Sequence, residues 1–181
     1  MIGRFFKRLF GPPRPPRFDA VFDGPDSDLV YDLIARIEGP RWRLEQLMAL
    51  TTPEIHLVRL CRFDGIFGNG GLQYWFECDH EVCGRHMGES FRAVGLDDAA
   101  EAMDLVFEVF PTPLHYDDFQ LRMAALSNLA DDFAPLEQRL WLAHDEIAAR
   151  VADFARRHKG AFEHLRHVRP WDSLREAFGH A

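Results

Sequence analysis

The sequence has few of the features that identify an enzyme, a secreted protein or a membrane protein. Among its 181 residues only three are cysteine, Cys61, Cys78 and Cys83. A sparse, odd set without a secretory signal favours free thiols in a reducing compartment, so we expect a cytoplasmic protein. Lys7 and Arg8 interrupt the N-terminal apolar run, which argues against a signal peptide. No window reaches the ~18 uninterrupted apolar residues of a membrane span.

β-Branched residues are also few, and no stretch sustains the alternation of apolar and polar residues that strands require. Apolar residues instead recur every three or four positions. This pattern predicts an all-α fold, a single compact domain of about seven to nine helices. We expect a basic amphipathic segment and proline-rich linker at 1–18, an acidic helical domain at 19–160, and a basic, histidine-containing extension with a short helix at 161–181.

Capping residues, glycines and prolines mark where the helices should begin and end. One helix is expected between a cap at Ser27 or Asp28 and a stop at Gly39, followed by a short helix at 42–50. A central, buried helix should start at a Thr52 cap with Pro53 in its first position. Two further helices are expected at about 86–94 and 96–110.

The C-terminal half predicts two more helices. Asp117 or Asp118 should open a helix that carries Leu121, Ala124, Ala125 and Leu129. Asp131 or Asp132 should cap a long helix that Gly160 stops. For roughly six turns its apolar residues keep spacings of three and four: Leu136, Leu140, Ala143, Ile147, Val151 and Phe154.

Charge is distributed unevenly along the chain. Residues 1–18 hold five basic residues and no acid, whereas residues 19–155 hold 26 acids against 10 arginines, a formal charge of −16. Residues 156–181 hold six basic and three acidic residues. The acidic body should repel nucleic acid and anionic lipid and attract basic protein surfaces. We therefore expect a basic protein as partner, without direct nucleic acid binding or membrane association.

The N-terminal segment has the pattern of a short basic amphipathic helix. Its apolar residues fall on one side and Arg4, Lys7 and Arg8 on the other: Ile2, Phe5, Phe6, Leu9 and Phe10. Such a segment could be a frayed terminus, pack against its own domain, dock on another protein or lie on a membrane. Residues 11–17, with four prolines, are typical of an extended polyproline spacer.

A glycine-rich corner precedes an aromatic run in the middle of the chain. Glycine and asparagine tolerate positive φ, so this motif predicts a helix, a tight corner and a second helix with the aromatic residues buried. The residues concerned are Gly68, Asn69, Gly70, Gly71, Tyr74, Trp75 and Phe76.

This corner also carries a family resemblance, together with three later elements. These are Phe91 to Gly95, the helix that ends at Phe110-Pro111, and Leu129 to Phe133. Over about residues 57–133 the chain resembles the bacterial DNA-mimic protein family, first defined as a domain of unknown function. Three positions depart from the usual family residues, which are Glu, Asn and Gln where this chain has Ile66, Gly68 and Tyr74.

The resemblance implies an all-helical, often dimeric, non-enzymatic protein without a cofactor. It also implies an acidic surface that occupies the DNA-binding site of a basic partner, such as a DNA-binding regulator.

The residues that could form this surface start with a row of acids on one helical face. Asp97, Glu101, Asp104 and Glu108 are spaced so that carboxylates recur every ~4.5–6 Å along the helix, whereas each DNA strand carries one charge per ~3.4 Å. Four further acids could complete the surface: Asp117, Asp118, Asp131 and Asp132. The solvated outer face of any amphipathic helix has the same pattern, so this alternative stays open.

An enzyme or metal protein that uses the corner is the alternative from a different class. Four soft ligands lie close together, Cys78, His80, Cys83 and His86, but their spacing lacks the second distant pair of a zinc site, and we assign no metal.

Histidines with acidic neighbours give candidate acid–base dyads: His56 with Glu54, His115 with Asp117 or Asp118, and His144 with Asp145. The loop from Gly68 to Gly71 could hold an anion, although it lacks the Lys and Ser/Thr of a phosphate loop. No catalytic residue is assigned. An immunity-type module that binds one partner through apolar contacts is a third hypothesis.

Overall fold

The computed structural model describes residues 17–38, 50–78, 86–108, 118–128 and 130–168. These residues form seven α-helices and one 3₁₀ helix, and the described ranges contain no strand. The helices are α2 (Phe18–Phe22), α3 (Asp26–Glu38), α5 (Thr52–Cys78), α6 (Met87–Ala93), α7 (Asp97–Glu108), α9 (Phe119–Asn128), α10 (Ala130–Arg157) and η2 (Lys159–His167). The all-α prediction is confirmed.

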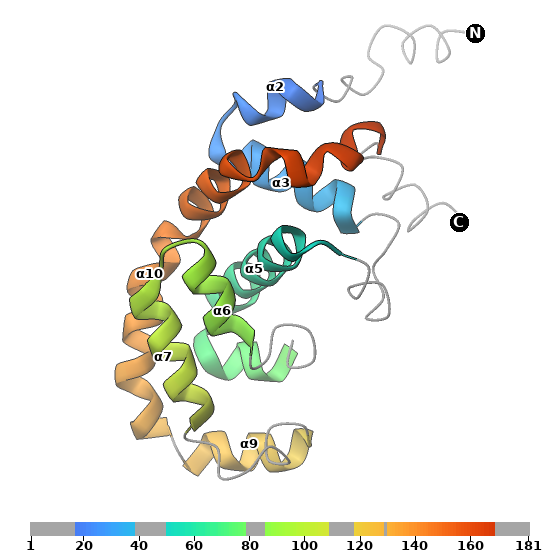
Figure 1. The fold of residues 1–181 in the computed structure, drawn as a ribbon. Coiled ribbons are helices and arrows are strands. Elements are labelled where there is room, and N and C mark those ends of the chain that lie inside the picture. The colour runs from blue at the N-terminus through green and yellow to red at the C-terminus, as the bar shows by residue number, and fades with distance from the viewer. Residues whose placement is uncertain (1–16, 39–49, 79–85, 109–117, 129, 169–181) are drawn as a thin grey trace, which may run out of the picture.

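The longest helix, α10, runs along one side of the molecule and contacts α3, α5 and α7 (Figure 1). Helix α5 crosses the middle, α7 packs between α6 and α10, and α2, α3 and η2 gather at one end, with α9 at the other. Five of the six apolar residues predicted for the inner face of α10 are buried, and Ala143 is half-buried. Each buried large aliphatic side chain stabilises the fold by about 1.5–3 kcal/mol, so this stripe fixes the position of α10.

The glycine corner divides α5 into two helical segments. Helical geometry continues through Asn69 and breaks at Gly70 and Gly71, where Gly71 has φ 67° and ψ −157°. The corner also leaves room for α10, because a Cβ at Gly71 would lie 1.8 Å from Glu137 Oε1. A Cβ at Gly68 would lie 2.8 Å from His144 Nε2. The predicted corner is present, and the glycines let two helices approach closely.

The aromatic run after the corner is buried only in part. Trp75 and Phe76 are fully buried, as expected, but Tyr74 is 41% exposed. Successive residues on a helix point about 100° apart, so three consecutive side chains cannot all face the core. The prediction that the whole run is buried was therefore wrong at Tyr74.

Several helix ends differ from the predicted ones. Helix α3 begins at Asp26, ahead of the predicted cap at Ser27 or Asp28. Glu54 accepts hydrogen bonds from the Thr51 amide and hydroxyl at 2.8 and 2.9 Å, so Thr51 rather than Thr52 is the cap of α5. Gly160 does not stop α10, which ends at Arg157; the chain continues through Gly160 as η2. By contrast, Gly95 follows α6 with φ 78°, the left-handed conformation expected of a glycine stop.

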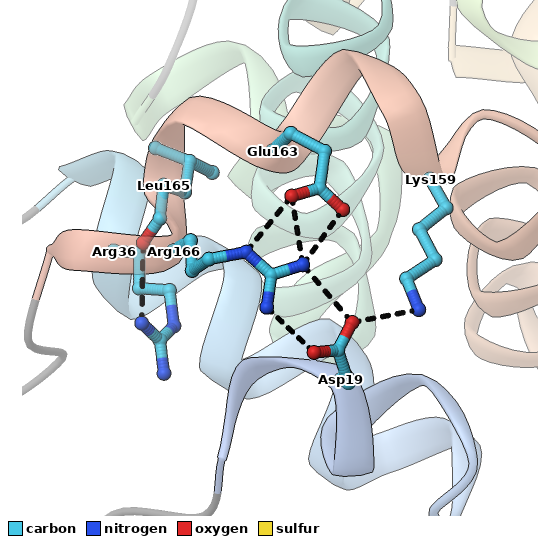
Figure 2. A network of polar contacts seen from close by, with 6 residues as sticks. All are labelled: Asp19, Arg36, Lys159, Glu163, Leu165 and Arg166. Atoms are coloured by element: carbon cyan, nitrogen blue, oxygen red, sulfur yellow. Dashed lines mark hydrogen bonds and ion pairs between the residues drawn. The ribbon is translucent and has the colours of Figure 1, made fainter.

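Ion pairs between charged side chains connect η2 to α2 at one end of the molecule (Figure 2). Arg166 binds Asp19 at 2.5 and 3.1 Å and also Glu163, while Lys159 Nζ lies 3.0 Å from Asp19 Oδ1. The hydrogen bonds from Arg166, and then from Lys159, hold the pKa of Asp19 well below its usual range. The segment after α10 is therefore tied to the helix that starts the described chain.

A buried arginine joins the same end to α3. Arg36 is 4% exposed, pairs with Asp32 one turn earlier, and donates to the carbonyls of Leu165 and Val168. Carbonyls at the end of a helix lack their usual intrahelical partners; Arg36 binds the Val168 carbonyl and is a second donor to the Leu165 carbonyl, which also accepts the Val168 amide at 3.0 Å. The Arg36 side chain thus connects the end of η2 to α3.

Candidate partner-binding surface

All four acids predicted to form a row lie on α7. Asp97, Glu101 and Glu108 are exposed and Asp104 is half-exposed. The other side of α7 is buried through Ala99, Ala100, Ala102, Met103 and Val106, which turns the acidic side outward. The structure therefore brings these carboxylates onto one solvent-facing side of a fixed helix.

Two carboxylates of α7 are held by an arginine from α10. Arg139 Nη2 lies 2.7 Å from Asp98 Oδ1 and 2.6 Å from Glu101 Oε2. The hydrogen bond from Arg139 lowers the pKa of Asp98, and the bonds to Asp98 and Glu101 raise the pKa of Arg139. The Arg139 cation therefore offsets part of the negative charge at this point.

A second arginine neutralises Asp104. Arg92, from α6, binds the Asp104 carboxylate, and this hydrogen bond raises the pKa of Arg92. The two helices are close here, because a Cβ at Gly88 would lie 2.1 Å from Asp104 Oδ1. Of the predicted row, Asp97 and Glu108 are the members without an ion pair to a described residue.

The second group of predicted acids is described only in part. Asp118 is exposed, and its carboxylate accepts a hydrogen bond from the Leu121 amide at 2.9 Å. Asp118 therefore caps α9, which was one of the two predicted alternatives. Asp132 is exposed in the first turn of α10, which begins at Ala130 rather than after an aspartate cap. Asp117 and the side chain of Asp131 lie outside the described residues.

Three exposed acids without an ion pair to a described residue lie on elements at one end of the molecule. Helix α7 ends, α9 lies and α10 begins there (Figure 1). We call Glu108, Asp118 and Asp132 the acidic end; none of them forms an ion pair with a described residue.

The other end of the molecule has three of its acids paired with bases, while Asp23 and Asp28 are exposed there without an ion pair to a described residue. Asp19 binds Arg166 and Lys159, Asp32 binds Arg36, and Arg156 Nη1 lies 2.7 Å from Asp26 Oδ1. Arg156 also donates to the carbonyls of Phe22 and Gly24 at 3.0 and 2.9 Å. Bases thus offset much of the negative charge at this end, whereas no described base pairs with the three acids of the acidic end.

The corner is occupied by the protein's own polar groups. Glu137 Oε1 lies 3.4 Å from the Leu72 amide, so a carboxylate from α10 faces the start of the second segment of α5. His144 Nε2 lies 3.3 Å from both the Asp64 carbonyl and Asp64 Oδ1. Burial raises the pKa of Asp64, and His144 partly opposes this shift. These contacts give the corner a packing role, and Glu137 stands where an anionic ligand would bind.

The predicted histidine dyads form other contacts. His56 Nδ1 lies 3.1 Å from Ser90 Oγ, and burial, followed by the positive charge of Arg59, lowers the pKa of His56. His144 Nδ1 is 3.9 Å from Asp145 Oδ1, farther than Nε2 is from Asp64. His115 lies outside the described residues. Neither described histidine therefore has the predicted acid as its nearest polar partner.

The proposed soft-ligand cluster is described at only two of its four positions, Cys78 and His86, because His80 and Cys83 lie outside the described ranges. Among the residues that the structure describes, no group of three or more potential ligands is arranged to hold a metal ion. No helix in those same ranges is long and apolar enough to cross a membrane.

Sequence reasoning missed the arginines that pair with α7. Arg92 and Arg139 are separated from their partners by 12 and 41 positions in the chain. Pairs at such separations have no local signal, unlike partners one helical turn apart. The available hint was the position of Arg139 one residue before the predicted inner-face residue Leu140, which indicates a side chain at the edge of that face.

Comparisons with known proteins identify one relationship. A family model described as DMP19-like protein matches residues 48–158, which include α5 to α10 and exclude α2, α3 and η2. Neither the curated proteins nor the solved structures contain a significant match to the chain.

Proposed function

Because the chain belongs to the DMP19-like protein family, we propose that it is a non-enzymatic interaction protein that occupies the basic site of a DNA-binding protein. In this function its carboxylates stand in for DNA phosphates. A partner that acts on DNA is compatible with the expected cytoplasmic location.

The observation that carries this proposal is the uneven neutralisation of acids. Around α2, α3 and η2, four bases (Arg36, Arg156, Lys159 and Arg166) pair with acids and surround the two exposed acids, Asp23 and Asp28, that have no ion pair with a described residue, whereas no described base pairs with Glu108, Asp118 or Asp132. Unpaired, exposed charges are the ones that a partner's arginines and lysines can bind without first breaking an internal pair. The acidic end is therefore the favoured contact region, and Asp97 lies about 16 Å away at the other end of α7.

The paired acids have a different part in this proposal. Arg139 and Arg92 fix the positions of Glu101 and Asp104, so these side chains lose little conformational freedom when a partner arrives. Their charge is already offset, so they contribute less long-range attraction. We therefore expect Glu108 and Asp132 to matter more for association than Glu101 and Asp104.

The test begins with capture of basic proteins from the cells that make this protein. Binding is compared at about 0.1 M and about 1 M salt, where the Debye length falls from about 10 Å to about 3 Å. A captured DNA-binding protein is then purified and bound to a fluorescent DNA duplex. Addition of the protein should release the DNA, and the release should weaken at the higher salt concentration.

Two matched double variants locate the contact. Glu108→Gln with Asp132→Asn removes two charges at the acidic end, and we expect binding to weaken about tenfold or more, equivalent to about 1.4 kcal/mol. Asp23→Asn with Asp28→Asn removes two exposed charges at the opposite end and should leave affinity nearly unchanged. Equal losses in both variants, or a complex insensitive to salt, would contradict the proposal. A complex that is insensitive to salt would favour binding through apolar contacts.

A further inference from the structure

Helix α10 has a second apolar face, which points to solvent. Trp141 is 39% exposed and Leu142 is 70% exposed. Ala134, Ala148 and Ala149 are exposed on the same helix. Positions 134, 141 and 148 are seven residues apart, the repeat with which one helix presents a seam to another. Leu142 points away from the buried stripe, whereas Trp141 lies to one side of it, against Phe67 of α5.

The apolar centre of this face is held in position. The Trp141 ring packs against Phe67 with 4.5 Å between the ring centroids, and Phe67 is fully buried in α5. The Trp141 ring also contacts His144 edge-on at 5.3 Å. Trp141 is therefore anchored on one side and open on the other, which is the state of a preformed contact surface.

The charge beside this face is negative. Asp145, one turn after Trp141, has a side chain that is 92% exposed, and its contact with a base is the 3.9 Å approach to His144. Asp132 is exposed in the first turn of the same helix. An occupant should therefore be a short helix with large apolar residues on one side and positive charges beside them.

The chain contains such a segment. Residues 2–10 have five large apolar residues at helical spacing, and three basic residues, Arg4, Lys7 and Arg8, but no acid. Large aromatic side chains of this kind would cover Leu142 and the open side of Trp141. The charges of the segment complement Asp145, while Asp132 lies on the opposite side of α10 from Trp141.

The lengths also agree. Helix α2 is fixed at the C-terminal end of α10, because Arg156 Nε donates to the Phe22 carbonyl at 3.0 Å and Lys159 contacts Asp19. From there to Trp141, α10 covers about 24 Å at 1.5 Å per residue. The polyproline spacer of residues 11–17 covers about 22 Å at 3.1 Å per residue. The spacer can therefore deliver the basic segment to Trp141 and Leu142.

We propose that residues 2–10 dock as a basic amphipathic helix on the outer face of α10, centred on Trp141 and Leu142 of the same chain. The inference goes beyond the proposed function and does not require a DNA-binding partner. Docking places positive charge next to Asp145 and covers apolar surface that would otherwise be exposed. It also makes the N-terminal segment an internal competitor for basic ligands that approach α10.

Disulfide trapping in the full-length chain tests the docking. The three native cysteines are changed to serine, and Phe6→Cys is combined either with Leu142→Cys or with Tyr31→Cys. Tyr31 is a fair control because it is 67% exposed and lies on α3, the helix that follows α2. Docking should make the intramolecular bond to position 142 form about tenfold faster or more than the bond to position 31, through a higher effective concentration. Changing Lys7 and Arg8 to glutamine should slow it.

Three outcomes would overturn the proposal. Equal trapping at positions 31 and 142 would indicate an undocked segment. A bond between positions 6 and 142 of two different chains would indicate exchange between copies. A bond between two chains at position 142 would indicate that a second copy covers this face.

A second measurement avoids the cysteine changes. Hydroxyl-radical labelling of Trp141 and Leu142 should be several-fold lower in the natural chain than in a Phe5→Ser, Phe6→Ser variant, because the docked segment shields both side chains from solvent. Labelling of Tyr31 serves as the internal standard. Equal labelling of Trp141 and Leu142 in the two proteins would also overturn the docking.

Discussion

Replacing Gly71 by alanine should destabilise the protein more than any ordinary helix substitution. At φ 67° and ψ −157° the backbone is in a region that side chains strongly disfavour, which costs about 1–3 kcal/mol. The new Cβ would also lie 1.8 Å from Glu137 Oε1, so α10 or the carboxylate must move, at a further cost of about 1–3 kcal/mol. We expect the free energy of unfolding to fall by about 2–6 kcal/mol in total.

Urea denaturation followed by circular dichroism measures this loss, with Gly65→Ala as the matched control. Gly65 is in the same helix, and a Cβ there meets nothing within 4 Å, so the control should be unchanged or stabilised by up to about 1 kcal/mol. Adding Glu137→Ala to Gly71→Ala should recover the part of the loss that comes from overlap and leave the backbone part. If Gly71→Ala is as stable as the natural chain, the close approach of α5 and α10 described above is incorrect.

Three further predictions concern charged groups. Arg139→Gln frees the carboxylates of Asp98 and Glu101, so a basic partner should bind several-fold more tightly and with steeper salt dependence, as titration at several salt concentrations would show. The pKa of Asp19 is lower in the folded than in the unfolded protein, so the ion pairs of Asp19 stabilise the fold fully above about pH 4, the unfolded pKa, and this contribution is lost as the pH falls below it. The difference in stability between the natural chain and Asp19→Asn should therefore shrink between pH 7 and pH 3. The pKa of His56 is lower in the folded than in the unfolded protein, so His56 does not affect stability above the unfolded pKa near 6.5 but destabilises the fold as the pH falls below that value. His56→Gln should therefore reduce the loss of stability between pH 7 and pH 5.

Local sequence signals predicted the parts of the fold that depend on local chemistry. The spacing of apolar residues identified the inner face of α10, because a helix that packs on one side needs such a stripe. Gly71 and Gly95 were identified because the left-handed conformation favours glycine over other residues. The row on α7 followed from the same periodicity, and its exposure agrees with the prediction.

The remainder depends on contacts between distant positions. Arg122 is fully buried and donates to the Phe76 carbonyl at 3.0 Å, whereas Leu121, next to it in α9, is 44% exposed. Hydrophobic periodicity predicts the reverse, with Leu121 buried and Arg122 exposed. It takes no account of a guanidinium that is buried because it binds a carbonyl at the end of another helix. Gly160 shows the same limit, because glycine permits a helix stop but does not require one.

Which acids form internal ion pairs is more informative about partner binding than the total number of acids. A partner's arginine that approaches Glu101 must compete with Arg139, which holds Glu101 and Asp98 at the same time; gaining one bond there would disrupt two existing ones. An arginine that approaches Glu108 or Asp132 breaks no ion pair with a described residue. A row of acids with perfect spacing along α7 would therefore bind less well than a shorter, unpaired group at its end. Affinity for a basic partner should follow the carboxylates that the fold leaves free, and neutralising Glu101 and Asp104 should matter less than neutralising Glu108 and Asp132.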